Sequence, residues 1–435
     1  MSTTLRTPTT SELLSLTRWR QSVFLVCLFG YVGYYICRKN ISAAFPLMSS
    51  EFGYSNSELG LIAFYSELAY AGGKIINGPL ADKFGGRKMF LIGMVGAIIS
   101  NILFSQGSNL MYFIGVWCLC RYFLSMGWGG LIKMIGNWYE PEKNGRVMGF
   151  ISLNFQFGGV VATLFAGFLI SQGFGWKAVF LFPAGVLGVV FILSFLYSKE
   201  KPTDLIQNVK FGREEIKDKE LKNNPRYPLK NISILLKSNS FRYVLVFSFF
   251  TTFLRSIFFF WTPKFLVDLG LGTSNAIMKS TLFPFLGCLG TVLLGWYTDK
   301  YAKNGDRAKA MWIMLTGLIV SLLSIVIGIQ SGEMNSFIVI MLGACGFFLL
   351  GPYSMSSGAL TLDIAGAEMA GSATGMIDSL GYIGGAIAVW SAGRLSDSLG
   401  WAEVFMLLSL CAILATFSAF LLSREFQKSG THVSV

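Results

Sequence analysis

Two arginines and a lysine lie inside stretches of sequence that are otherwise apolar. Arg38 and Lys39 end one such stretch, and Arg255 lies in the middle of another. A charged side chain at the centre of a membrane costs about 2.5–3.5 kcal/mol on insertion scales, so charges there usually serve a function. A guanidinium group is planar and donates pairs of hydrogen bonds, which suits it to phosphate. The pattern predicts a phosphate site that contains Arg38 and Arg255.

The two arginines occupy corresponding positions of an internal repeat. Four residues recur 217 positions later as the same types: Arg38, Pro46, Gly78 and Asp82 become Arg255, Pro263, Gly295 and Asp299. Such repeats are typical of secondary transporters, whose substrate site lies between the two halves near the membrane midplane. We therefore expect both arginines to point at the central axis. Structural ion pairs are the alternative, and neither stretch has an acidic residue near its arginine.

Other polar residues in apolar surroundings are predicted to line the same cavity. They are Tyr31, Tyr35, Tyr70, Lys74, Lys133, Gln156 and Asp378. Tyr31 and Tyr35 precede Arg38 by seven and three residues, which places them around the same helical face. The tyrosines suit core packing equally well. The charged residues are stronger candidates, and Asp378 is expected to pair with Lys74 in one conformation.

The deep charges do not balance. The basic residues counted in the predicted cavity are Arg38, Lys39, Lys74, Lys133 and Arg255, and the acidic ones are Glu67 and Asp378. This leaves an excess of three positive charges. A phosphate monoester carries about −2 at neutral pH and would offset most of that excess. A neutral sugar or a cation would not.

Twelve apolar stretches are long enough to carry these residues across a bilayer. A membrane-spanning helix needs about 20 apolar residues, and the candidates are 22–47, 57–80, 88–106, 109–138, 146–171, 176–197, 241–268, 273–298, 310–330, 335–361, 369–394 and 401–423. Of the 435 residues, 53% are hydrophobic and only 13% are charged. Soluble proteins carry about 25% charged residues. The composition argues against a soluble enzyme and for a membrane protein.

The predicted fold class is an all-α integral membrane protein with 12 transmembrane helices. They form two pseudo-symmetric six-helix bundles, 1–197 and 241–435, joined by a charged linker, 198–240, which is either a solvated tether or a regulatory segment. Most of the 35 Lys and Arg residues fall in the tails and in loops of one side, so both termini are expected in the cytoplasm. The net charge of +12 then reflects topology and not a nucleic-acid partner.

The remaining residue types restrict the chemistry further. The single histidine, His432, lies in the C-terminal tail, so no histidine relay or catalytic triad is expected inside the protein. The seven cysteines form no CxxC pair, which argues against a zinc site. Gly72-Gly73-Lys74 lacks the first glycine of a phosphate-binding loop. We expect no enzyme activity, no metal and no cofactor.

The segment that joins the second and third apolar stretches is predicted to be a gate. It reads Gly78-Pro-Leu-Ala-Asp82-Lys-Phe-Gly85-Gly-Arg87-Lys, and Asp299 belongs to a weaker copy in the second half. The segment resembles the GxLaDrxGrrk loop of the major facilitator superfamily. Glycines let helices approach closely, and Asp82 can cap a helix or pair with a basic neighbour. A simple basic turn is the alternative, but it does not explain the Gly–Asp–Gly spacing.

A longer motif points to one branch of that superfamily. Tyr31-Val-Gly-Tyr-Tyr-Ile-Cys-Arg38-Lys-Asn40 resembles the GYxxYYxxRKN signature of the organophosphate:inorganic phosphate antiporters, which include glycerol-3-phosphate and hexose-phosphate transporters. The resemblance implies the major facilitator fold and exchange of a phosphate ester for inorganic phosphate, by a monomer in the cell (inner) membrane. It also implies that Arg38 and Arg255 bind phosphate, supported by Tyr31, Tyr35, Tyr70 and Lys74.

Three departures from the glycerol-3-phosphate transporters bear on the substrate. Phe155 stands where they have a histidine, and Phe260 and Pro284 stand where they have acidic residues. These departures favour a sugar phosphate, such as a hexose phosphate, over glycerol-3-phosphate. Two alternatives stay open. A membrane receptor for a phosphate ester would have the same site, and a proton symporter could use Glu67 or Asp378 but would leave the arginines unexplained.

Overall fold

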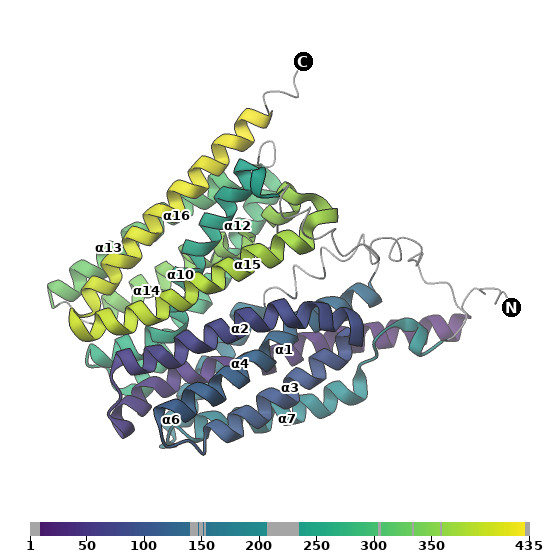
Figure 1. The fold of residues 1–435 in the computed structure, drawn as a ribbon, viewed down its shortest axis with the longest axis horizontal. Coiled ribbons are helices and arrows are strands. Elements are labelled where there is room, and N and C mark those ends of the chain that lie inside the picture. The colour runs from purple at the N-terminus through teal and green to yellow at the C-terminus, as the bar shows by residue number, and fades with distance from the viewer. Residues whose placement is uncertain are drawn as a thin grey trace.

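The computed structural model describes the chain in eight parts: residues 9–139, 147, 151, 154–206, 235–302, 306–332, 335–356 and 359–430. Within these parts every regular element is a helix. The helices form two bundles that lie side by side (Figure 1). The all-α fold class predicted from the sequence is therefore confirmed.

The first bundle contains α1 (Thr10–Phe52), α2 (Asn56–Phe84), α3 (Gly86–Phe104), α4 (Leu110–Trp138), α6 (Asn154–Ser171) and α7 (Ala178–Tyr197), and the short 3-10 helix η1 (Pro202–Asp204) follows it. The second bundle contains α10 (Asn239–Asp268), α11 (Thr273–Ser280), α12 (Leu282–Tyr301), α13 (Ala308–Gln330), α14 (Asn335–Ser356), α15 (Ala359–Ser398) and α16 (Trp401–Gly430). These helices correspond to the twelve predicted spans. The predicted linker falls largely outside the described residues, so its bounds stay a prediction.

The eighth predicted span is divided into two helices. α11 ends at Ser280 and α12 begins at Leu282. Pro284 lies in the first turn of α12 and has no N–H group to donate to the carbonyl of Ser280, which interrupts the helix at this point. The break leaves Ser280 on the wall of a cavity between the bundles.

In the described part of the chain, nine helices are long and apolar enough to cross a membrane. α2 and α15 do not belong to this set, although they have 29 and 40 residues. They are more polar because they carry charged residues of the interior, among them Glu67, Lys74 and Asp378. α2 and α15 face each other across the two bundles (Figure 1).

We call the two ends of the molecule the Thr10 end and the Phe52 end, after the ends of α1. At the Phe52 end, α15 joins the first turn of α2. The carboxylate of Asp397 accepts hydrogen bonds from the backbone N–H groups of Asn56, at 3.0 Å, and Ser57, at 2.6 Å. A helix leaves these N–H groups unpaired, and its dipole favours a negative charge there. Toward the Thr10 end the two bundles spread apart (Figure 1).

Replacing Asp397 by alanine should loosen the first turn of α2. Loss of a capping carboxylate costs about 1–2 kcal/mol, so we expect the amides of Asn56 and Ser57 to exchange with solvent deuterium about tenfold faster. Hydrogen-exchange mass spectrometry of the peptide 53–60 measures this. Glu403→Ala, which removes another carboxylate at the same end, is the matched control. Unchanged deuterium exchange in the Asp397 variant would show that the hydrogen bonds of Asp397 do not hold the first turn of α2 to α15.

Candidate functional site

Arg38 and Arg255 lie at the same depth on facing helices. Arg38 precedes the end of α1, Phe52, by 14 residues, and Arg255 precedes the end of α10, Asp268, by 13. At about 1.5 Å per residue, both lie about 20 Å from the Phe52 end. The two guanidinium carbons are 5.5 Å and 5.6 Å from the centre of one ring, that of Phe259. The structure thus brings together the two arginines that the repeat predicted to converge.

Lys39 adds a third cation to this group. Its Nζ is 4.2 Å from the centre of the Phe259 ring and donates a hydrogen bond to the Phe259 carbonyl oxygen. Lys39 is on α1 and Phe259 on α10, so the contact crosses between the bundles. Arg38 and Lys39 are buried, at 5% and 8% exposure. Three cations therefore surround one phenylalanine in the interior.

Aromatic rings stabilise the two arginines. The guanidinium carbon of Arg38 is 4.4 Å from the ring centre of Tyr70 and 5.4 Å from that of Tyr35. Its Nη1 also donates a hydrogen bond of 3.3 Å to the Tyr70 hydroxyl. Arg255 lies 4.8 Å from the ring centre of Tyr353. Cations over aromatic faces gain about 0.5–2 kcal/mol, more where water is excluded.

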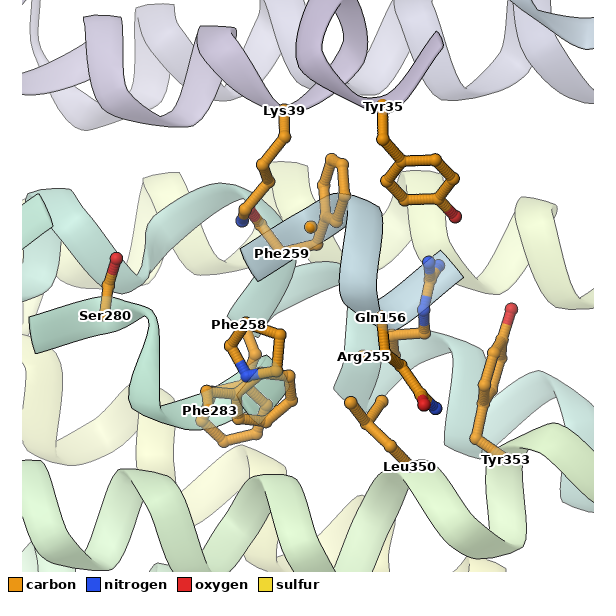
Figure 2. Close-up of a pocket in the computed structure, with 12 residues that line it drawn as sticks. Tyr35, Lys39, Gln156, Arg255, Phe258, Phe259, Ser280, Phe283, Leu350 and Tyr353 are labelled. Atoms are coloured by element: carbon orange, nitrogen blue, oxygen red, sulfur yellow. The ribbon is translucent and has the colours of Figure 1, made fainter. Parts of the chain in front are cut away.

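A cavity that is lined by residues of both bundles adjoins the cations. Figure 2 shows Tyr35 and Lys39 entering it from α1, and the guanidinium of Arg255 pointing toward Tyr35. The remaining wall combines three side chains that carry a polar group with apolar residues: Gln156, Ser280 and Tyr353, and Gly159, Phe258, Phe259, Phe283, Pro284 and Leu350. Among these described residues there is no carboxylate. The cavity suits an anion that carries an organic part.

The two deep acidic residues are paired with other cations. Lys74 Nζ lies 2.5 Å from a carboxylate oxygen of Asp378, which joins α2 to α15 as the sequence predicted. Glu67 pairs with Arg121 of α4, and both side chains are buried. The acids therefore leave Arg38, Lys39 and Arg255 without a negative partner among the described side chains.

Arg121 is a functional candidate that sequence reasoning missed. Its guanidinium carbon is 4.4 Å from the ring centre of Tyr70, the same distance as that of Arg38. The Tyr70 ring thus contacts two guanidinium groups, and Glu67 neutralises the second. A lone arginine inside the apolar stretch 109–138 was the signal that could have revealed it. Glu67 holds Arg121 against Tyr70, and Tyr70 in turn contacts Arg38.

The structure places Lys133 away from the cations around Phe259. A Cβ atom added to Gly86 would lie 2.9 Å from the Cβ of Lys133, so Lys133 is beside the junction of α2 and α3 and not beside Phe259. In the count of deep charges made from the sequence, Arg121 takes the place of Lys133. The excess therefore stays at three positive charges. Tyr31 belongs to the aromatic residues beside Arg38, with its ring centre 5.5 Å from that of Tyr35 and 5.3 Å from that of Trp128.

The predicted gating residues lie at the Thr10 end. Gly85 has φ +95°, which favours glycine, and separates α2 from α3. Arg87 donates hydrogen bonds to Ser198 Oγ, at 2.9 Å, and to the Phe195 carbonyl, at 2.7 Å. Gly78 faces open space, since an added Cβ atom would meet nothing within 4 Å among the described atoms. The side chain of Asp82 lies outside the described residues.

An unpredicted residue, Glu200, caps the third helix. Its carboxylate accepts hydrogen bonds from the backbone N–H groups of Gly86, at 2.8 Å, and Arg87, at 2.6 Å.

In the second bundle Asp299, the predicted gating residue, forms an ion pair of 2.6 Å with Arg307. Arg307 also pairs with Asp363 at 3.2 Å, which joins the start of α13 to that of α15.

Comparison with known proteins places this architecture in a family. Residues 27–389 match the sequence model of the Major Facilitator Superfamily. The chain is a member of this superfamily. It is 28% identical to the glycerol-3-phosphate transporter of Bacillus subtilis, over 96% of this chain and 95% of the relative. It is 26% identical to the probable hexose phosphate transport protein of Chlamydia trachomatis, over 91% and 89%.

Further comparisons agree with this membership. The chain is 27% identical to the membrane sensor protein UhpC of Escherichia coli, over 91% of this chain and 90% of the relative. Among solved structures, a bacterial homologue of the human lysosomal transporter Spinster superposes with a TM-score of 0.72 at 15% identity, covering 94% and 98% of the two chains. A D-xylose–proton symporter gives 0.71 at 14%, covering 92% and 96%. At such identities the structures show a shared fold.

Removing Glu67 alone should destabilise this superfamily member strongly. Glu67→Leu leaves the charge of Arg121 buried without a partner, and breaking a buried pair costs about 3–5 kcal/mol of unfolding free energy. Glu67→Leu combined with Arg121→Leu should recover most of that loss. Thermal unfolding of the purified variants in detergent measures both. A double variant no more stable than the single one would contradict the pairing.

Proposed function

We propose that this transporter exchanges an organic phosphate ester for inorganic phosphate by alternating access. The observation that supports it most is the group of three cations, drawn from both bundles, around Phe259. A phosphate monoester, which carries about −2, would offset most of their excess charge. The relatives named for glycerol-3-phosphate and hexose phosphate transport support the same substrate class. The protein would act as a monomer in the inner membrane, with both termini in the cytoplasm.

Phosphate binding would couple the two bundles. Arg38 belongs to the first bundle and Arg255 to the second, so a phosphate held by both draws the bundles together. Without an anion the two guanidinium groups repel each other, which opposes closure of the empty protein. A ligand shifts a conformational equilibrium only by its different affinities for the two states. Exchange of one anion for another follows from this without a separate coupling ion.

The ion pair of Lys74 and Asp378 would act as a gate beside the site. Lys74 lies one helical turn from Tyr70 toward the Thr10 end, and its Nζ is 5.1 Å from the ring centre of Tyr382. The rings of Tyr70 and Tyr382 are 4.8 Å apart across α2 and α15. A phosphate bound at Arg38 attracts Lys74 in competition with Asp378. Breaking the pair frees α2 from α15 at this level.

The organic part would be a sugar, such as a hexose, in preference to glycerol. Phe258 and Phe283 stack with ring centres 4.6 Å apart on the cavity wall. Aromatic faces give such a part a broad apolar surface to pack against. Phe155 and Phe260 stand where the glycerol-3-phosphate transporters carry a histidine and an acid, which supports a different organic part.

Arg38→Lys tests the phosphate clamp. Lysine keeps the charge but loses the planar pair of donors. A hydrogen bond to a charged group contributes about 1.5–3 kcal/mol, so we expect phosphate exchange in proteoliposomes to fall by about 10–100-fold. Arg394→Lys, an exposed arginine at the Phe52 end, is the control and should keep the wild-type rate. Normal exchange by the Arg38 variant would rule out the clamp.

Asp378→Asn tests the gate. The amide cannot hold the lysine charge, so Lys74 becomes free to meet the substrate anion. We expect the rate of exchange, or the order in which sugar phosphates compete for it, to change by at least about threefold, equal to about 0.6 kcal/mol. Competition of labelled phosphate exchange by a panel of sugar phosphates measures both. An unaltered profile would count against a gating role for the pair.

A phosphate-ester receptor is the second candidate, because one relative is a membrane sensor. Its binding site would use the same cations. Counterflow of labelled phosphate through proteoliposomes separates the two functions. A receptor binds phosphate and shows no counterflow, whereas the proposed transporter shows both.

A further inference from the structure

Gln156 presents a fixed hydrogen-bond acceptor inside the cavity. Its Nε2 donates a hydrogen bond of 2.8 Å to the hydroxyl oxygen of Thr291. The hydroxyl of Thr291 in turn donates its only hydrogen to the carbonyl of Gly287, at 3.0 Å. In this geometry the Thr291 oxygen accepts from Gln156. The amide nitrogen therefore faces Thr291 and the amide oxygen faces away from it.

The amide oxygen of Gln156 is buried without a donor. Gln156 is 6% exposed, and Oε1 has no hydrogen-bond partner among the residues that the structure describes. The side chain lines the same cavity as Arg255 and Lys39 (Figure 2). A buried acceptor left unsatisfied costs about 1–3 kcal/mol. A buried acceptor normally has a hydrogen-bond donor, and a ligand in this cavity would supply one.

Ser280 gives the cavity a second acceptor. Its hydroxyl donates to the carbonyl of Ile277, at 2.6 Å. The hydrogen is thereby committed to the backbone, and the oxygen offers its lone pairs to the cavity that it lines. Gln156 and Ser280 are thus both acceptors, while Arg38, Lys39 and Arg255 are all donors. The cavity wall accordingly combines cationic donors with two uncharged acceptors, of which Gln156 lies beside Arg255 (Figure 2).

We propose that Gln156 selects phosphate esters that carry a hydroxyl group on their organic part. The inference rests on the proposed function, since it places the phosphate at the arginines. A substrate hydroxyl can donate to Oε1 of Gln156 and satisfy it. A carboxylate at neutral pH has no hydrogen to donate, and would face the acceptors with its own lone pairs. Hydroxylated esters are therefore preferred over alkyl phosphates and over phosphorylated carboxylic acids that lack a hydroxyl group.

Two phosphate esters of equal chain length test this selection directly. Glycerol 3-phosphate and n-propyl phosphate carry the same phosphate and three carbons, and only the first has hydroxyl groups. Each competes with labelled inorganic phosphate for binding to the purified full-length protein and for exchange in proteoliposomes. We expect glycerol 3-phosphate to compete at least about tenfold better, because a site built to bond a hydroxyl rejects the analogue that lacks it. Equal competition in the wild-type protein would overturn the proposal.

Variants assign the selection to Gln156. Gln156→Leu should reduce the tenfold ratio between the two esters to about one. Thr291→Val, which releases the amide to rotate, should reduce the ratio in part. Gln172→Leu changes an exposed glutamine at the Phe52 end and should keep the wild-type ratio. A wild-type ratio in Gln156→Leu would overturn the proposal.

The same experiment separates this inference from the proposed function. Phosphate exchange without preference for the hydroxylated ester contradicts the role of Gln156 and leaves the exchange mechanism standing. Phosphate binding without exchange contradicts the transport mechanism, and the ratio measured by binding then still decides the role of Gln156. Strong competition by phosphoenolpyruvate, equal to that of glycerol 3-phosphate, would contradict the selection of hydroxyl donors.

Discussion

The rest of the structure depends on keeping three like charges together in a medium of low dielectric. At 4 Å two unit charges interact by about 1 kcal/mol in water and about 4 kcal/mol at an effective dielectric constant of 20. Among the described side chains, aromatic faces and the Phe259 carbonyl hold Arg38, Lys39 and Arg255, and no carboxylate pairs with them. The protein can tolerate this arrangement where an anion relieves it. The unbalanced charge is thus the main energetic cost of the site and, in the proposed function, the source of its affinity for phosphate.

Helix α2 connects this charge to the movement of the bundles. One stripe of α2 carries Glu67, Tyr70 and Lys74, which contact Arg121, Arg38 and Asp378 respectively. The first turn of the same helix is held by a carboxylate of α15 at the Phe52 end. A change in charge at the cations therefore acts on a rigid element that contacts the opposite bundle at two levels. In the proposed function this contact is the physical link between anion binding and alternating access.

Much of this could be predicted from the sequence, and the exceptions have identifiable causes. Length and hydropathy located the spans, and the repeat placed Arg38 and Arg255 together because corresponding residues share a depth. Lys133 was assigned to the cavity wrongly, because apolar neighbours do not reveal depth along a 29-residue helix. Glu200 follows α7, and only tertiary packing brings it to the start of α3. The acceptor of Gln156 depends on a chain of hydrogen bonds that no local pattern encodes.

The central claim is that an anion between the two bundles permits the conformational change and that the empty protein resists it. Uptake of labelled phosphate into proteoliposomes, with and without phosphate inside, tests this most directly. Our account predicts rapid uptake into phosphate-loaded vesicles and little uptake into empty ones. Equal uptake into loaded and empty vesicles would contradict it, because the unoccupied site would then return as readily as the occupied one.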